Sequence, residues 1–313
     1  MKYRTLGRTG LRVSVLGIGT GGPSQFGQGS GVPEADVSRM VRRALALGVN
    51  FFDTASGYGE SEAILGRALA DVPRADYVLA TKVQVARDEW TATPEDVVAT
   101  VERSLERLRV DVIDIMQFHG VKPEDYARTI EIFLPVMVRL QEQGKFRFLG
   151  VSETYSQDFR HEMFPMALAD DHFDTAMIGY NMISPTAEHR VLPMCHERNV
   201  GVICMVAVRR ALSRPEVLAE RIAYAKGKGL IERDSVPDHD PLGWLVKGHV
   251  TSLPAAAYKY VASHPAMGTV LTGTANIDHL EANVKAILGP PLPNGDMARL
   301  RDIFGAVWEP LGN

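Results

Sequence analysis

Short apolar runs recur eight times along the 313 residues of this chain, and helical patterns lie between them. The clearest helical pattern begins at Pro94, which suits a first helical turn, and places apolar residues at helical spacing up to Leu108. A chain that alternates in this way folds as a parallel sheet covered by helices. The predicted strands are Val15–Ile18, Phe51–Phe52, Val78–Thr81, Val112–Phe118, Phe146–Val151, Thr175–Gly179, Val200–Met205 and Thr269–Leu271.

Eight alternations with short connections favour an α/β fold of the closed (β/α)₈ TIM-barrel type, of ~250 residues, over an open doubly wound sheet. Two additions account for the remaining length. Residues 1–13 contain a turn, Thr5–Gly10, between two extended pieces, so we predict an N-terminal β-hairpin that covers one barrel end. Residues 209–253 are irregular and predict a long loop after the seventh strand. All of these segments are expected to form one domain, 1–313.

The composition restricts the possible partners. The chain is 45% apolar and 23% charged, its net charge is −4, and it contains no long basic run. These values predict no nucleic-acid partner, and no apolar stretch approaches the ~18 residues of a transmembrane helix. The early run VSVLGIGTGG is too short and too rich in glycine for a signal peptide. We therefore expect a cytoplasmic protein with a small-molecule partner, and the sequence leaves its oligomeric state open. Cys195 and Cys204 are expected to be reduced and structural.

The segment Gly17–Gly22 matches the G-x-G-x-x-G pattern of dinucleotide-binding folds. In those folds a helix begins at the third glycine, so that its first N–H groups meet the pyrophosphate. Here residues 23–31 follow, which are rich in glycine and read as a loop. We therefore predict a turn at the barrel mouth that is either flexible or closely packed, with Thr20 lining the pocket.

Four residues suited to proton transfer, Asp53, Tyr58, Lys82 and His119, fall at or just after the ends of three consecutive predicted strands. In a parallel barrel these ends share one rim, where such folds keep their chemistry. A free tyrosine has a pKa of about 10, which makes it a slow proton donor at neutral pH. Lys82 near the phenol would lower that pKa, Asp53 would keep Lys82 charged, and His119 could bond the substrate oxygen.

Each of these residues alone has an ordinary structural explanation: a helix cap, a loop residue, a solvated strand end and a buried histidine. Their combination at successive strand ends indicates interconversion of a carbonyl and an alcohol. A metal-dependent hydrolase on the same barrel would place histidine pairs at such ends, but the nine histidines form no H-x-H pair. No metal ligands are therefore predicted.

Longer motifs around these residues resemble the aldo-keto reductase family. They are FDTASGYG at 52–59 with Ser61-Glu62 and Leu65-Gly66, Lys82, Ser104–Leu108, His119, Gly144–Arg147, Gly150–Ser152, Gly273-Thr274 and Asn283. The resemblance covers nearly the whole chain. It implies a (β/α)₈ barrel that binds an extended nicotinamide cofactor without a Rossmann domain. It also implies a catalytic tetrad of Asp53, Tyr58, Lys82 and His119, with Tyr58 as acid in reduction and base in oxidation.

The residues at the cofactor contacts that the resemblance implies match the usual family pattern only in part. Ser152 fits the family pattern, but Glu153 stands where an asparagine is usual and Met177 where a glutamine is usual. Members that prefer a 2′-phosphate carry Lys or Arg around 273–279, where this chain has Asp278. NAD and NADP therefore both remain possible. Arg209 or Arg210 could meet the pyrophosphate. The candidate cofactor contacts are Thr20, Ser152, Glu153, Arg209, Gly273, Thr274 and Asn283.

The sequence thus predicts an NAD(P)-dependent oxidoreductase acting on an aldehyde, ketone or sugar, with Tyr58 as proton donor and acceptor. An alternative is a cofactor-binding regulatory protein with little turnover, like the channel-associated β subunits of this family. The substrate and the physiological direction depend on loops whose conformation the composition does not predict.

Overall fold

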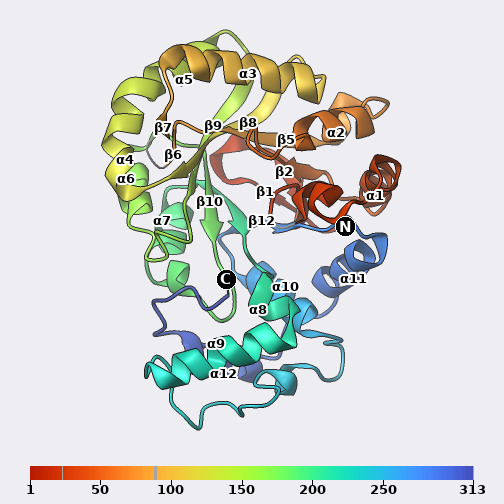
Figure 1. Ribbon diagram of the computed structural model, residues 1–313, viewed down its shortest axis with the longest axis vertical. Coiled ribbons are helices and arrows are strands. Elements are labelled where there is room, and N and C mark those ends of the chain that lie inside the picture. Colours follow the sequence, from red (N-terminus) through yellow and green to blue (C-terminus); the bar gives the residue numbers. More distant parts are fainter. Residues whose placement is uncertain (23, 88–89, 313) are drawn as a thin grey trace.

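Eight parallel strands close into a barrel in the computed structural model, which describes residues 1–22, 24–87 and 90–312 (Figure 1). Each barrel strand pairs with the next barrel strand along the chain, and the last pairs with the first, so the sheet has no free edge. The predicted closed barrel is confirmed. The barrel strands are β3 (Leu16–Gly19), β4 (Phe51–Asp53), β5 (Val78–Val83), β8 (Ile113–Val121), β9 (Phe146–Glu153), β10 (Thr175–Gly179), β11 (Gly201–Met205) and β12 (Met267–Thr272).

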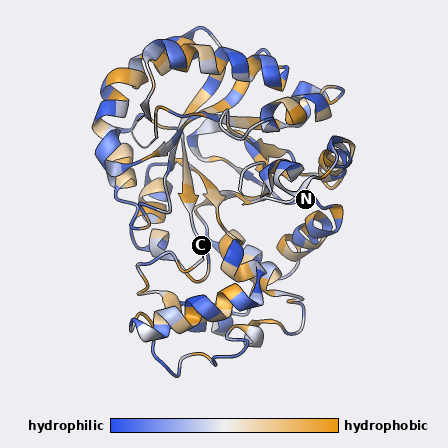
Figure 2. Ribbon diagram, in the orientation of Figure 1, coloured by the Kyte–Doolittle hydropathy of each residue, from blue (hydrophilic) through white to orange (hydrophobic). Residues whose placement is uncertain are grey.

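The helices pack around the outside of the barrel and bury one face against it. In Figure 2 they alternate between hydrophilic and hydrophobic residues. In α3, for example, Val97, Val101, Leu105 and Leu108 are buried, as their spacing predicts. Thr93, just before Pro94, and Asp96, in the first turn, form a capping box at its start. The helices that follow the barrel strands are α1 (Glu34–Ala46), α2 (Ser61–Ala68), α3 (Pro94–Leu108), α4 (Pro123–Arg128), α5 (Leu134–Glu142), α6 (Met163–Asp170), α7 (Val191–Glu197), α10 (Leu253–Ser263), α11 (Ile277–Leu288) and α12 (Asn294–Phe304).

The N-terminal hairpin closes the end of the barrel where the strands begin. β1 (Tyr3–Thr5) pairs antiparallel with β2 (Arg12–Ser14), as predicted. Leu6, at the turn, is fully buried and packs in one apolar cluster with residues from the interior of the barrel, such as Phe51 and Ile115. Arg4 donates from the hairpin to the carbonyl of Met267 at 2.7 Å, at the start of β12. This end is therefore plugged, and the opposite rim is left for chemistry.

The connection after the seventh barrel strand is long, as predicted, but it is not a loop throughout. Two helices lie within it, α8 (Arg210–Ser213) and α9 (Pro215–Gly227), followed by a 3-10 turn at Gly243–Leu245. In α9 the buried residues Leu218, Ile222 and Ala225 follow a helical period over only two turns. Glycines directly beyond them interrupt that period, which explains why the sequence reads as irregular.

A short antiparallel hairpin of β6 (Ala86–Arg87) and β7 (Trp90–Thr91) follows β5. Among the described residues, no helix is both long enough and apolar enough to cross a lipid bilayer.

Candidate active site

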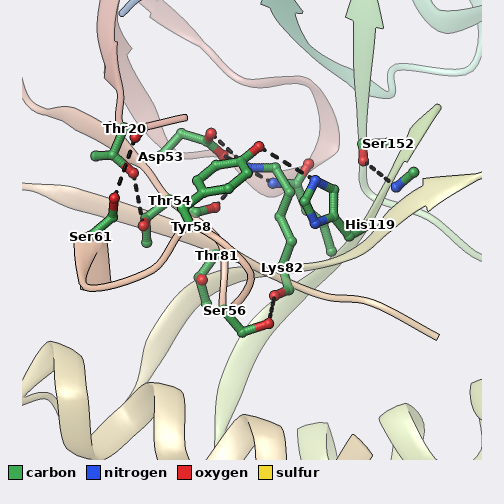
Figure 3. Close-up of polar contacts among 12 residues, drawn as sticks. Thr20, Asp53, Thr54, Ser56, Tyr58, Ser61, Thr81, Lys82, His119 and Ser152 are labelled. Atoms are coloured by element: carbon green, nitrogen blue, oxygen red, sulfur yellow. Dashed lines mark hydrogen bonds and ion pairs between the residues drawn. The ribbon is translucent and has the colours of Figure 1, made fainter. Parts of the chain in front are cut away.

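The strand register brings the predicted catalytic residues together at the rim opposite the hairpin. Asp53 is the last residue of β4 and pairs with Ala80 of β5. Lys82 lies two residues further along β5 and pairs with Gln117 of β8, two residues before His119. Because side chains alternate along a strand, Gln117 and His119 lie on the same face of β8. Three neighbouring strands therefore present their polar side chains at one place (Figure 3).

Lys82 is fixed by a set of short hydrogen bonds. Its Nζ donates to both carboxylate oxygens of Asp53, at 2.8 and 2.6 Å, and to the carbonyl of Thr54 at 2.7 Å. Gln117 Nε2 adds a further bond to Asp53 Oδ1 at 3.3 Å. All of these side chains are buried. Burial opposes the charge on Lys82, but the Asp53 carboxylate beside it favours that charge, and the pKa of the amine is raised, so Lys82 is a cation at neutral pH.

The phenol of Tyr58 lies close to that cation, and a dashed line in Figure 3 joins its hydroxyl to His119. Lys82 Nζ is 5.2 Å from the ring centroid of Tyr58. The Tyr58 hydroxyl lies 3.4 Å from Nε2 of His119, and the two rings meet edge to face. Tyr58 lies in the turn before α2, whereas Asp53, Lys82 and His119 lie on strands. The predicted grouping of Asp53, Tyr58, Lys82 and His119 at one rim is therefore what the structure places there.

Lys82 acts to lower the pKa of Tyr58, as predicted, but the pKa as a whole is raised and not lowered. Burial raises the pKa of Tyr58 and exceeds the opposing effect of Lys82, while Asp53 also raises it. The phenol is consequently protonated at neutral pH. In this state the residue can donate a proton, and it accepts one only when a further positive charge or a higher pH favours the tyrosinate.

Ser152 and Glu153 end β9 but engage different neighbours. Ser152 Oγ accepts from the N–H of Gly120 at 2.9 Å, next to His119. Glu153 Oε2 contacts His161 Nδ1 at 2.7 Å, and its Oε1 accepts from the N–H of Gly179 at 2.7 Å. Neither the Glu153 nor the His161 side chain has exposed surface. The Glu153 carboxylate thus connects β9 to β10 and to His161. A contact with a cofactor would require it to face open space, and it does not.

A cavity of about 530 Å³ lies at the same rim, between the segment 24–39 and the start of α11. Gly273 and Thr274, two predicted cofactor contacts, line it together with Arg39, Asp36 and Asp278. A Cβ at Gly273 would have no described heavy atom closer than 3.8 Å, so the backbone there is open to a ligand. A cavity with exposed backbone and polar side chains at this rim fits the adenosine half of a dinucleotide.

The other predicted cofactor contacts lie around this rim. Asn283, in α11, donates to Thr272 Oγ1 at 2.9 Å and so fixes the end of β12. Thr20 is buried, and its hydroxyl donates to Thr54 Oγ1 at 2.8 Å. Arg209 follows β11 and is partly buried. Burial and Arg210 lower its pKa, whereas the phenols of Tyr155 and Tyr58 act in the opposite sense, which puts Arg209 on the Tyr58 side of the rim.

Sequence reasoning missed Gln117 and Thr54. Gln117 could have been found, because it lies two residues from His119 in one strand and therefore on the same face. The role of Thr54 could not, since its carbonyl holds Lys82 through a backbone atom that any residue type supplies.

Comparison with known proteins agrees with this geometry. The model of the Aldo/keto reductase family matches residues 16–304. L-galactose dehydrogenase of Arabidopsis thaliana is 28% identical, over 100% of this chain and 96% of its own length. Probable aldo-keto reductase 1 of Glycine max is 27% identical, over 98% of this chain and 89% of its own length. The holo form of an aldo-keto reductase from Bacillus halodurans has 27% sequence identity and a TM-score of 0.74, with 100% of both chains covered.

Proposed function

Since the chain belongs to the aldo-keto reductase family and is an NAD(P)-dependent oxidoreductase, we propose that Tyr58 transfers the proton when it interconverts a carbonyl and an alcohol. The observation that carries this proposal is the position of the Tyr58 hydroxyl, 3.4 Å from His119 Nε2, with Lys82 Nζ 5.2 Å from the ring centroid. In reduction the phenol protonates the oxygen that becomes the alcohol, and in oxidation the tyrosinate removes that proton.

In this proposal Lys82, Asp53 and His119 assist proton transfer by the Tyr58 phenol. Lys82 is a buried cation that stabilises the tyrosinate formed as the proton leaves. Asp53, held by Gln117, fixes the amine and balances its charge. His119 supplies a nitrogen beside the phenol, where it can also bond the oxygen of the substrate. A bound nicotinamide supplies or accepts the hydride, and Gly273 and Thr274 would hold the adenosine end of that cofactor.

The charges of the rim cavity support a preference for NAD over NADP. Arg39 lines the cavity, but its guanidinium is paired with Asp36 at 2.8 Å. Asp278 adds a second carboxylate to the same lining. A 2′-phosphate would meet two carboxylates and one cation that is already paired. The ribose hydroxyl of NAD can instead donate a hydrogen bond to a carboxylate or accept one from the guanidinium.

The experiment is a nicotinamide absorbance assay with NADH and NADPH against aldehydes, ketones and aldoses. Aldoses enter the panel because one relative is named L-galactose dehydrogenase. Wild-type protein should turn over with a lower KM for NADH than for NADPH. Tyr58→Phe should lower kcat at least about 100-fold, as expected for loss of a general acid. Cofactor affinity, followed by nicotinamide fluorescence, should be retained.

Tyr3→Phe is the matched control, because it makes the same chemical change at an exposed tyrosine of the hairpin. It should leave turnover unchanged. Wild-type turnover in Tyr58→Phe would contradict the proposed role. Tight cofactor binding without turnover on any substrate of the panel would instead favour a regulatory protein.

A further inference from the structure

The described residues of the glycine-rich segment 17–31, which leave out residue 23, lie against the turn that carries Tyr58. Its first three residues belong to β3, and the remainder connects β3 to α1. Figure 3 shows Thr20 of this segment bonded to Thr54 and to Ser61, on the two sides of the Tyr58 turn. The segment is therefore attached to the chain both before and after the phenol.

Gly21 packs directly on the Tyr58 ring. A Cβ at Gly21 would come within 2.6 Å of Cε2 and Cζ of Tyr58, and within 3.0 Å of its hydroxyl oxygen. Such distances are too short for any side chain, so the backbone of Gly21 forms one wall of the space occupied by the phenol. A glycine is required here because of this approach.

Gln28 holds the same turn through its side-chain amide. Its Nε2 lies 3.2 Å from the carbonyl oxygen of Tyr58, 3.0 Å from Ser61 Oγ and 2.8 Å from the carbonyl oxygen of Gln25. Its Oε1 accepts from the N–H of Glu60 at 2.9 Å. One partly buried side chain thus joins the segment to three residues within and just after the Tyr58 turn, and both ends of its amide are used.

The backbone of the segment is unusual just before Gln28, which contacts the Tyr58 turn. Gln25, Phe26 and Gly27 have φ values of 42°, 59° and 93°, which is the left-handed region. Phe26 is fully buried in the main apolar core despite that backbone. Strained residues of this kind persist only where surrounding packing enforces them, and they cluster at functional sites. The buried Phe26 anchors the loop so that Gln28 reaches Tyr58.

Because Tyr58 comes from a turn and not from a strand, its position depends on what holds that turn. We infer that Gln28 is a positioning residue that, with Gly21, fixes the Tyr58 hydroxyl at its place beside Lys82 and His119. This inference depends on the proposed role of Tyr58. Gln28 touches no reacting atom and acts through the turn.

The test is Gln28→Glu, which keeps the shape and the acceptor for Glu60 but places an oxygen against the carbonyls of Gln25 and Tyr58. We expect kcat to fall about 10- to 100-fold, since small misplacements of a reacting group have effects of this size. The cofactor dissociation constant should change by less than about twofold. Gln25→Glu is the matched control, because the side chain of Gln25 is exposed and forms no hydrogen bond with a described residue. It should leave kcat unchanged.

A double-mutant cycle separates positioning from general damage. If Gln28 acts through the phenol, Gln28→Glu should have little further effect on kcat in a Tyr58→Phe background. Equal fold losses in both backgrounds would overturn the inference. Wild-type kcat in Gln28→Glu, with Tyr58→Phe inactive, would also overturn it and would leave the proposed function intact. Wild-type kcat in Tyr58→Phe would instead remove the proposed function itself.

Two further measurements apply if Gln28→Glu does not fold. Gly21→Ala pushes its Cβ against the Tyr58 ring and should lower kcat with cofactor affinity retained. In the wild-type protein the Glu60 amide should exchange with solvent more slowly than the Gly57 amide, which donates to no described residue. Fast exchange at Glu60 would show that the Gln28 bond is absent and would overturn the inference without any variant.

Discussion

The buried pair of Lys82 and Asp53 shows how function constrains single residues in this protein. Two charges in a low-dielectric interior lose hydration that their attraction only partly restores. Here Thr54 and Gln117 supply the remaining hydrogen bonds. An apolar pair could be equally stable, whereas under the proposed function the ion pair keeps a cation beside Tyr58.

Lys82→Met should destabilise the fold by about 3–5 kcal/mol, because it leaves Asp53 buried without its partner. Adding Asp53→Asn should recover much of that loss, since both charges are then removed. Neither variant should recover turnover. Denaturant unfolding measures the first effect and the nicotinamide assay the second. A double variant as unstable as the sum of the two single variants would contradict this account of the pair.

The sequence predicted the positions of all four tetrad residues, because strand ends in a parallel barrel share a rim. It did not predict the protonation of Tyr58, since the raised pKa comes from burial by segments distant in the chain. Nor did it predict the surroundings of Glu153, whose carboxylate is taken up by His161 and Gly179. Such contacts depend on side-chain directions after folding, which periodicity alone does not give.

At the scale of elements, the close approach of two helices restricts which residue type can stand at their contact. Gly66 of α2 faces the end of α3, and a Cβ there would lie 2.3 Å from the carbonyl oxygen of Arg107. The two helices can meet at this distance only because residue 66 has no side chain. The eight barrel strands and helices such as α1, α3 and α10 were predictable from their period, whereas β6 and β7 were not predicted. The helix α9 was hidden by the glycines and lysines that follow its short apolar stripe.

Gly66→Ala should lower the free energy of unfolding by about 1–3 kcal/mol, the usual cost of overpacking. Gly227→Ala, at the end of α9, is the matched control, because its Cβ would meet no described heavy atom within 4 Å. That variant should be neutral or stabilising by up to about 1 kcal/mol. Equal unfolding midpoints for the two variants would contradict the packing argument.

At the scale of the whole molecule, the buried hairpin and the candidate active site lie at opposite ends of the barrel. The hairpin plugs the end where strands begin, and the tetrad and rim cavity lie where strands end. The hydrogen bonds that hold Lys82 and Asp53 come from Thr54 and Gln117 and not from the hairpin, so the geometry of the site should not depend on the hairpin.

Leu6→Ala should therefore cost about 2–5 kcal/mol of stability, because it empties a fully buried site, and should leave kcat of the folded protein unchanged. Unfolding curves and turnover at a temperature well below the transition check both parts. A large fall in kcat with the protein still folded would show that the two ends are coupled.

The most direct test of proton transfer by Tyr58 is the pH dependence of kcat/KM for carbonyl reduction with NADH. Burial raises the pKa of the phenol above its ordinary value, so the donor form persists through neutral pH and is lost only on the alkaline side. We predict a rate that stays level from about pH 6 and falls above about pH 10, as Tyr58 ionises. A single inflection near pH 6.5, the ordinary range of histidine, would contradict the account and make His119 the proton donor.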